Sequence, residues 1–284
     1  MKIKGKLIII GGKEDKGNEE LNSEFVKIGI LERIVQESRK KKKSRIEIVT
    51  SASTIPFELG KDYIKAFNSL GAENTGFFVI ENREEASNPE ILKRLEDADV
   101  VFFTGGDQLR LTSILGGTPF FDILKEKLEE EENFIYAGTS AGAAAASESM
   151  IAKGNSADAI LKGEIRTSAG FGLIENVFFD THFIQRGRIG RLLQVIVSNP
   201  KVLGIGLEEN TALIITPDSK MEAIGTGVAI LVDGRSIKNT NLLDIKERAP
   251  ISIENMVLHV MSDGDIYDLE AHRLEIITKE ECRI

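Results

Sequence analysis

One serine lies in a sequence context that favours nucleophilic catalysis. Residues 134–137 form an apolar, strand-like run, and the segment Gly-Thr-Ser-Ala-Gly at 138–142 follows it and leads into a run of alanines. A Gly-x-Ser-x-Gly pattern between a strand and a helix is typical of a nucleophile elbow, a sharp turn that projects the serine hydroxyl above the sheet. Glycines avoid clashes in such a turn, and the helix start at Ser140 directs free N–H groups toward a developing oxyanion. A plain helix N-cap is the alternative.

Three histidines could accept the serine proton. His182 directly follows the strand-like run 177–180, and open α/β sheets place their sites at strand ends. His259 lies inside an apolar run, as a histidine within a strand would, and His272 has polar surroundings near the C-terminus. His182 is therefore the favoured general base, with a core or capping histidine as the alternative.

A catalytic histidine also needs an acid that orients the ring and stabilises its cation. Glu208 and Glu209 stand next to each other in a stretch of glycines and apolar residues at 203–213. Burying an unpaired carboxylate there would be costly, so we expect at least one of the two to have a partner. At this point either glutamate can be the acid.

Two further segments carry groups that could bind a substrate. Thr-Gly-Gly-Asp-Gln at 104–108 ends another strand-like run and offers both backbone N–H groups for an oxyanion hole and an amide side chain. A glycine turn with Asp107 as a helix N-cap is the alternative. Arg186, Arg188 and Arg191 follow His182 in an expected helix. Arginines favour bidentate recognition of a carboxylate, and plain surface charge is the alternative.

The elements that would position these residues alternate along the chain. Strands are expected at 7–10, 46–49, 77–80, 100–103 and 134–137, and helices at 23–38, at 63–70 and from Pro89 and Pro119 onward. Such alternation predicts an α/β fold with a mostly parallel sheet flanked by helices. After residue 200 the pattern changes to strands and turns, and Asp233-Gly234 after the run 228–232 predicts a tight hairpin. We expect one domain over residues 1–284.

Composition excludes several classes of protein. The 284 residues carry 45 acidic and 36 basic side chains, and the net charge of −9 argues against nucleic acid as a partner. The apolar runs are far shorter than the ~18 residues a membrane-spanning helix needs, and the N-terminal run is too short for a signal peptide. We therefore expect a cytoplasmic protein that does not enter a membrane. A lone Cys282 and scattered histidines predict no disulfide, metal site or cofactor.

Two charged runs fit exposed surface better than a binding site. The basic run 39–45 follows an expected helix, where cations favour the negative end of the helix dipole. The acidic run 129–132 closes another expected helix. Both are interpreted as solvated segments.

Five segments in this order resemble the cyanophycinases, serine-type hydrolases of a peptidase family that also contains the aspartyl dipeptidases (peptidase E). They lie at 11–16, 104–108, 138–143, 180–191 and 204–212, so the resemblance covers nearly the whole chain. It implies cleavage of cyanophycin, a poly-aspartate with an arginine on each β-carboxyl, to β-Asp-Arg dipeptides. It also implies a homodimer.

The resemblance assigns a role to individual residues. It implies that Ser140 is the nucleophile, His182 the base and Glu209 the acid, with Glu208 as the second choice. The N–H groups of Gly106 and Ala141 would form the oxyanion hole. The positions that would line the substrate groove are Gln108, Asp180, Thr181, Arg186 and Arg191. Asp180 is expected to meet a substrate guanidinium, and the arginines to hold an aspartyl carboxylate.

One position departs from the family pattern. Thr181 stands where the family usually has glutamine, so a hydrogen bond to substrate would be lost. An aspartyl dipeptidase-like enzyme for small peptides is therefore one alternative, and a non-catalytic binding protein on the same fold is another. A general α/β-hydrolase is disfavoured, because its histidine comes last, after the acid.

Overall fold

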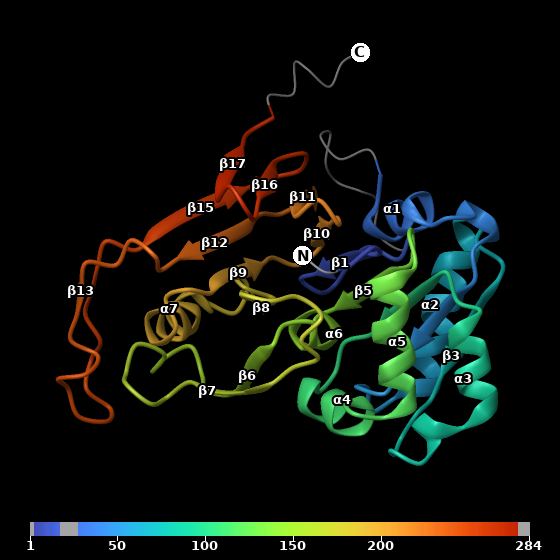
Figure 1. The fold of residues 1–284 in the computed structure, drawn as a ribbon, viewed down its shortest axis with the longest axis horizontal. Coiled ribbons are helices and arrows are strands. Elements are labelled where there is room, and N and C mark those ends of the chain that lie inside the picture. Colours follow the sequence, from blue (N-terminus) through green and yellow to red (C-terminus); the bar gives the residue numbers. More distant parts are fainter. Residues whose placement is uncertain (1–2, 18–27, 278–284) are drawn as a thin grey trace.

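The fold centres on a nine-stranded sheet (Figure 1). The computed structural model describes residues 3–17 and 28–277. In spatial order the strands are β17 (Arg273–Glu275), β16 (Ile266–Asp268), β11 (Lys220–Gly225), β10 (Thr211–Ile215), β1 (Lys6–Ile10), β5 (Ile135–Thr139), β4 (Val100–Phe103), β2 (Ile46–Val49) and β3 (Thr75–Phe78). On one side of β1, the strands β5, β4, β2 and β3 continue the sheet in parallel pairs. On its other side, β10, β11, β16 and β17 continue it in antiparallel pairs. The predicted parallel sheet is confirmed and continues into an antiparallel half.

Helices cover both faces of the parallel half. The helices are α1 (Ile30–Glu37) and α2 (Pro56–Ser69) on one face, and α3 (Pro89–Glu96), α4 (Gln108–Leu115), α5 (Pro119–Glu130) and α6 (Ala141–Ala145) on the other. In β1, Ile8 and Ile10 join the core under α1 and α2, whereas Leu7 and Ile9 join the opposite core. Successive strand residues point to opposite faces, so a strand buried on both faces must be apolar throughout.

A second, four-stranded sheet packs against the first. Its order is β15 (Val257–Met261), β12 (Ala229–Asp233), β9 (Leu203–Leu207) and β8 (Val177–Asp180), and α7 (Ile189–Ser198) covers it. Phe179 and Ile205 face the core shared with the large sheet, whereas Phe178 packs with Leu192 of α7. Since β8 and β9 are parallel neighbours, their carboxyl ends lie side by side. The residues that follow these two strands are thereby brought together.

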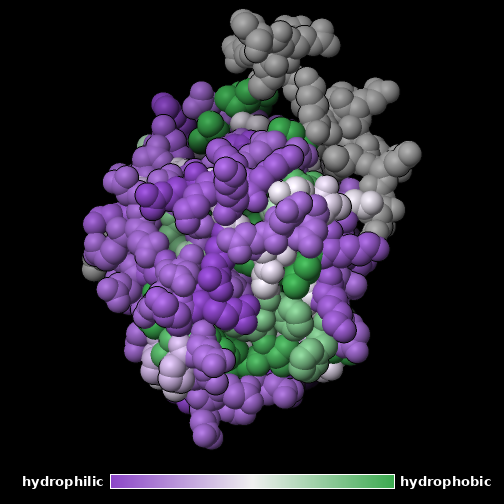
Figure 2. Space-filling model, turned by 90° about the vertical axis from the view of Figure 1, so that its right-hand side faces the viewer, coloured by the Kyte–Doolittle hydropathy of each residue, from purple (hydrophilic) through white to green (hydrophobic). Residues whose placement is uncertain are grey.

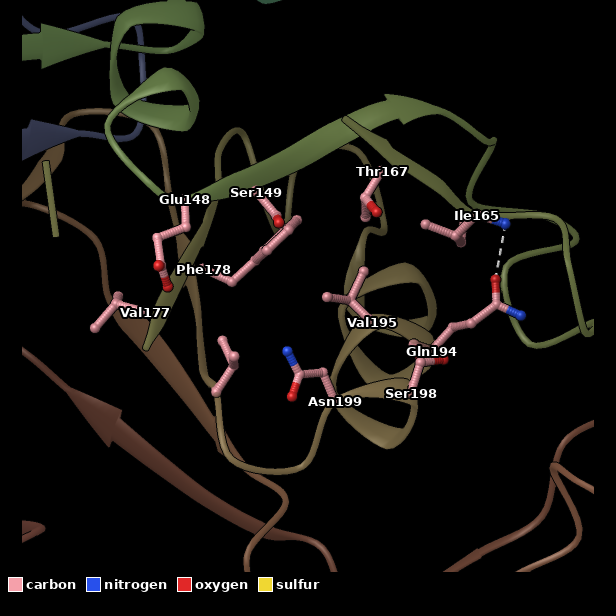
Figure 3. A pocket seen from close by; sticks show the side chains of 11 residues that line it. Glu148, Ser149, Ile165, Thr167, Val177, Phe178, Gln194, Val195, Ser198 and Asn199 are labelled. Atoms are coloured by element: carbon pink, nitrogen blue, oxygen red, sulfur yellow. Dashed lines mark hydrogen bonds between the residues drawn. The ribbon is translucent and has the colours of Figure 1, made fainter. Parts of the chain in front are cut away.

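The remaining elements are short. They are the hairpin of β6 (Ser149–Lys153) and β7 (Arg166–Ala169), the pair β13 (Asn239–Thr240) and β14 (Ile253–Glu254), and 3₁₀ turns at Lys41–Lys43 and Glu85–Ser87. A cavity of about 280 Å³ lies between α7 and the strands β6 to β8 (Figure 3). Glu148, Thr167 and Asn199 line it, and Ser140, His182 and Glu209 do not.

Most local predictions are confirmed, and some bounds need correction. The strand expected at 77–80 is β3 at 75–78, and the helix expected at 63–70 is the last part of α2. Asn88 caps α3 through its side chain, and Pro89 and Pro119 begin their helices as expected. The helix expected at 23–38 begins at Ile30, and residues 18–27 lie outside the described residues. The hairpin expected after 228–232 is wrong. β12 pairs with β9 on one edge and β15 on the other, so neither edge is left for the polar residues that follow it.

The surface on the β3 side is mostly hydrophilic, with a band of hydrophobic residues across it (Figure 2). Ile55 and Phe57, at the start of α2, are more than half exposed, and the Phe57 ring packs edge-on against Phe77 of β3. The basic run 39–45 is exposed over residues 39–43, as predicted, whereas Ser44 is buried and Arg45 is half-buried and paired with Glu47. Within residues 3–17 and 28–277, no helix has the length and apolar character to cross a membrane.

Candidate active site

Ser140 occupies a strained turn between β5 and α6. Its backbone has φ +51° and ψ −103°, a conformation that costs free energy and tends to occur at functional sites. A Cβ on Gly138 would lie 2.6 Å from the carbonyl of Gly142, and one on Gly142 would lie 2.6 Å from Phe103 of β4. The two glycines therefore let α6 lie directly on the sheet, as the elbow motif predicts.

His182 brings its ring against this serine from the other sheet. Its Nε2 lies 3.0 Å from Ser140 Oγ, and its backbone N–H donates to the carbonyl oxygen of Gly11 (2.9 Å). The residue has φ +48° just beyond β8. A Cβ on Gly12 would overlap the imidazole, so only glycine at this position leaves room for the ring.

Glu209 completes the arrangement on the far side of the imidazole. Its Oε1 lies 2.7 Å from His182 Nδ1, and the turn that carries it is fixed by the Asn210 N–H, which donates to the Gly12 carbonyl oxygen (2.8 Å). Glu208 points elsewhere, because its Oε2 accepts from the backbone N–H of Val228 (2.6 Å). The structure thus brings Glu209, and not Glu208, to His182.

The predicted oxyanion-hole segments lie beside the serine. A Cβ on Gly105 would be 3.8 Å from Ser140 Oγ, so this glycine loop faces the hydroxyl. Ala141 is the first residue of α6, and its N–H has no acceptor within the helix. Asp107 caps α4, accepting from the N–H of Leu109 (2.8 Å). The N-cap and the glycine loop beside Ser140 are therefore two features of the same segment.

Two of the three arginines behind His182, Arg188 and Arg191, are held by an acid of the chain itself. Asp180 is buried, and both of its oxygens accept hydrogen bonds from the guanidinium of Arg191. Arg188 donates to Asp180 (3.3 Å) and to the Thr181 carbonyl oxygen (2.6 Å). Arginines of the chain thus occupy the carboxylate that we expected to meet a substrate guanidinium, and Thr181 is buried beside them.

Two other predicted substrate residues lie apart from this cluster. Arg186 is exposed, and among the described residues it has no ion pair. Gln108, at the start of α4, donates its side-chain amide to the carbonyl oxygen of Ile151 in β6 (2.8 Å). Arg186 is therefore the cation beside His182 that has no acidic partner there.

Comparison with known proteins places this chain in a family. Residues 7–223, which include all three residues of the Ser-His-Glu arrangement, match the model of Peptidase family S51. The chain belongs to peptidase family S51. It is similar to a cyanophycinase from Synechococcus elongatus, at 34% identity over 96% of this chain and 81% of that protein. It is also similar to one from Geminocystis herdmanii, at 32% identity over 95% of this chain and 96% of that protein.

Solved structures agree with the S51 fold. A peptidase from an acI-B1 Actinobacterium superposes with a TM-score of 0.67 at 22% identity, covering 94% of this chain and 98% of the other. A putative peptidase E from Listeria monocytogenes gives a TM-score of 0.54 at 16% identity, covering 78% and 99%. These likenesses concern the fold, and the family resemblance predicted from the sequence is confirmed.

The electrostatics of the S51 site favour a neutral histidine and an ionised acid. Burial lowers the pKa of His182, and Arg186 and Arg188 lower it further, while the hydrogen bond to Glu209 opposes them. Burial alone would raise the pKa of Glu209, but hydrogen bonds from His182 and Lys13 outweigh it and lower that pKa. Near neutral pH the imidazole is therefore free to accept a proton while the carboxylate stays charged.

Sequence reasoning assigned no role to two residues of this S51 site. Lys13 forms an ion pair with Glu209, at 3.1 Å between Nζ and Oε2. Glu14 is buried and accepts from the hydroxyls of Tyr63 and Thr139, the residue before the nucleophile. The available signal was a charged pair directly after a glycine turn at the end of β1. Within the described ranges, no group of three or more His, Cys, Asp or Glu side chains is placed to hold a metal ion, and Cys282 lies outside those ranges.

Proposed function

We propose that this S51 peptidase hydrolyses cyanophycin to β-Asp-Arg dipeptides, with Ser140 as nucleophile, His182 as general base and Glu209 as the orienting acid. The observation that carries the proposal is the continuous hydrogen-bonded series from Ser140 Oγ through both ring nitrogens of His182 to Glu209 Oε1. The similar proteins named cyanophycinase, which span almost the whole chain, support the choice of substrate.

The geometry supports an acyl-enzyme mechanism. Ser140 Oγ attacks the backbone carbonyl carbon of an aspartyl residue while His182 Nε2 takes the hydroxyl proton. His182 then gives this proton to the leaving amine, and the C–N bond breaks. Water attacks the resulting ester with the same histidine as base, which releases the dipeptide and restores Ser140. Throughout, Glu209 holds Nδ1–H and stabilises the imidazolium.

The negative charge that develops on the carbonyl oxygen needs donors that are already in place. We assign this role to the N–H groups of Gly106 and Ala141, one from the glycine loop beside Ser140 and one from the first turn of α6. Gly106 has φ +145°, and a Cβ there would overlap the carbonyl oxygen of Ala52. Glycine is therefore required for this loop to lie so close to the neighbouring strand end.

For substrate binding we assign different roles to the arginines. Arg186, exposed and beside His182, is the residue that would hold an aspartyl carboxylate. Asp180 and Arg191 form a buried pair and are assigned to positioning, because their charges already neutralise each other. Thr181 is buried, so we expect its backbone, rather than its side chain, to shape the groove. Gln108 would contribute from the start of α4, where its amide also donates to the Ile151 carbonyl oxygen.

Incubation with purified cyanophycin, followed by mass analysis of the products, tests the proposal. The wild-type protein should release β-Asp-Arg, and Ser140→Ala should lower kcat by about 10⁴ to 10⁶, as loss of a triad nucleophile does. Thermal unfolding of the variant should match wild type, because the glycines rather than the hydroxyl set the turn. A fluorophosphonate should label the wild type and leave the variant unlabelled.

Two outcomes would contradict parts of the proposal. Alanine-variant activity within about tenfold of wild type would remove Ser140 from the mechanism. Turnover of soluble Asp-X dipeptides with no release from the polymer would keep the serine mechanism and replace the substrate. The two parts can therefore fail separately.

We also propose that residues 1–284 form one domain, that the protein assembles as a homodimer and that it acts in the cytoplasm. The single-domain proposal is supported by a core that joins residues from Ile3 to Tyr267 across both sheets. A single cooperative melt and a sedimentation mass of two chains are the expected results. Two separate melting transitions, or a monomer, would contradict the respective proposal.

A further inference from the structure

A short segment after β1 contacts His182 and the turn that carries Glu209. This segment, residues 11–15, is termed the glycine strap. Its carbonyl groups accept from the N–H of His182 and of Asn210, and the N–H of Asp15 donates to the side chain of Asn210 (3.1 Å). The strap thus fixes both the histidine and the turn that carries Glu209.

Lys13 is the strap residue that reaches the acid. It has φ +47°, and although its side chain is 71% exposed, its Nζ lies 3.1 Å from Glu209 Oε2. His182 uses the other oxygen, Oε1. The carboxylate is thus held at both oxygens, by the imidazole on the inside and by the ammonium group on the outside.

We propose that Lys13 is a positioning residue that shares Glu209 with His182 and thereby sets how strongly the acid stabilises the imidazolium. The proposal rests on the proposed function, in which His182 must be neutral to accept the Ser140 proton. A cation on Oε2 offsets part of the carboxylate charge that His182 senses. It also restrains rotation of the carboxylate, so Oε1 stays directed at Nδ1.

The other charged side chains near His182 and Glu209 either have partners of their own or are the same in every variant used below. Arg186 and Arg188 face His182 and lower its pKa. Glu208 is turned toward the Val228 N–H, and Asp180 is paired with Arg191. Lys16, three residues beyond Lys13, lies over the ring of Tyr63, 3.9 Å from its centroid. Removing the Lys16 charge is therefore a matched control from the same part of the chain.

The first experiment compares Lys13→Met, Lys13→Arg and the control Lys16→Met by the pH dependence of kcat/KM on a short, soluble multi-arginyl aspartate peptide. Without Lys13, Glu209 stabilises the imidazolium more, so the acidic limb of the profile should move to higher pH. Losing an exposed ion pair of this kind should lower kcat/KM roughly two- to fivefold on the acidic limb. At the plateau the rate should stay within about twofold. Lys13→Arg should restore the profile, and Lys16→Met should follow wild type.

The salt dependence of the difference between wild type and Lys13→Met is a further test. A merely structural role of Lys13 would leave this difference unchanged by salt. Because Lys13 is exposed, screening should weaken its effect and bring wild type and Lys13→Met closer together at high ionic strength. A profile that is identical in wild type and Lys13→Met at low salt overturns the proposal. So does a uniform loss at every pH that Lys13→Arg fails to restore.

The second experiment needs no substrate, so it separates this proposal from the proposed function. The chain has three histidines, which allows each ring to be followed by NMR as pH changes, with His182 assigned from the His182→Asn variant. In Lys13→Met the His182 midpoint should rise, while those of His259 and His272 stay as in wild type. An unchanged His182 midpoint overturns the role of Lys13 even if the enzyme is active. A raised midpoint supports it even if cyanophycin is not cleaved.

Discussion

The two sides of the candidate active site are held by different physical interactions. The nucleophile side, at the end of β5, is fixed by close contacts among glycines, the helix α6 and the backbone of β4. The histidine and acid side, at the ends of β8 and β9, is fixed by hydrogen bonds and ion pairs among charged side chains. Steric fit therefore fixes the position of Ser140, whereas charge pairing governs the protonation of His182.

Backbone strain is common to both sides. Ser140, His182, Asn210 and Lys13 all have φ between +47° and +51°, in the left-handed region that residues other than glycine adopt infrequently. Each such residue costs of order 1–3 kcal/mol and persists only where its surroundings require it. The surroundings here are the glycine strap and the ends of β5, β8 and β9, so the strain is concentrated where the two sides meet.

The largest effect expected on the charged side comes from Glu209→Gln. Converting a triad acid to its amide disturbs the histidine tautomer and can lower kcat by about 10⁴. Glu208→Gln is the matched control, because the same change removes a charge that does not face His182 and leaves an amide oxygen that can still accept from the Val228 N–H. Rates of both variants near neutral pH, with a thermal melt of each, decide the comparison. A reversed ranking would transfer the role to Glu208, and two nearly wild-type rates would mean that another group orients the ring.

The next largest effect tests whether the arginine cluster is structural. Asp180→Asn leaves the guanidinium of Arg191, which is only 9% exposed, without a counter-charge. Removing one partner of a buried ion pair costs about 3–5 kcal/mol. Asp218→Asn breaks an exposed pair with Lys220 and should cost at most about 1 kcal/mol. Denaturant unfolding of both variants measures the difference, and equal losses would show that burial of the Asp180 pair has no energetic consequence.

A smaller effect is expected from crowding the steric side. Gly142→Ala places a Cβ 2.6 Å from Phe103, so α6 must move away from the sheet. Overpacking of this kind costs about 1–3 kcal/mol, and the displaced Ser140 should also lose activity. In Gly29→Ala the new Cβ meets nothing within 4 Å, so a loss below about 1 kcal/mol is expected. A fully stable and active Gly142→Ala would show that the close approach of α6 is not required.

The same contrast explains what could be predicted from the sequence. The elbow was predictable, because its motif, its strand and its helix are contiguous in the chain. The strand at 7–10 and the helix start at Pro89 are likewise local. The pairing of Lys13 with Glu209, and the partners of β12, depend on contacts between residues far apart in the chain. No spacing rule encodes such contacts.

Asp180 illustrates the same limit within a single segment. Its charge and its place beside His182 suggested an acid facing the substrate, but Arg191, eleven residues further along, folds back from α7 to meet it. Predicting this contact would have required the side of α7 on which Arg191 lies. A family pattern names the residue, whereas only the packing of α7 against the second sheet shows what the residue touches.

The smallest expected effect is a shift in pH dependence, and it reports on the charged side of the site. Burial, with Arg186 and Arg188, lowers the pKa of His182 below its ordinary value of 6.5 despite the opposing hydrogen bond to Glu209. The base must be neutral to act, so the acidic limb of kcat/KM should lie below pH 6.5, and activity should persist in mildly acid solution.

Stability should follow the same sign. The unfolded chain protonates this histidine first, so the free energy of unfolding decreases as the pH falls below 6.5 toward the lower folded-state pKa. Added salt screens the exposed Arg186 and should move the limb back toward 6.5. A limb above 6.5 would mean that Glu209 outweighs burial, and the charged side would then hold an imidazolium rather than a base.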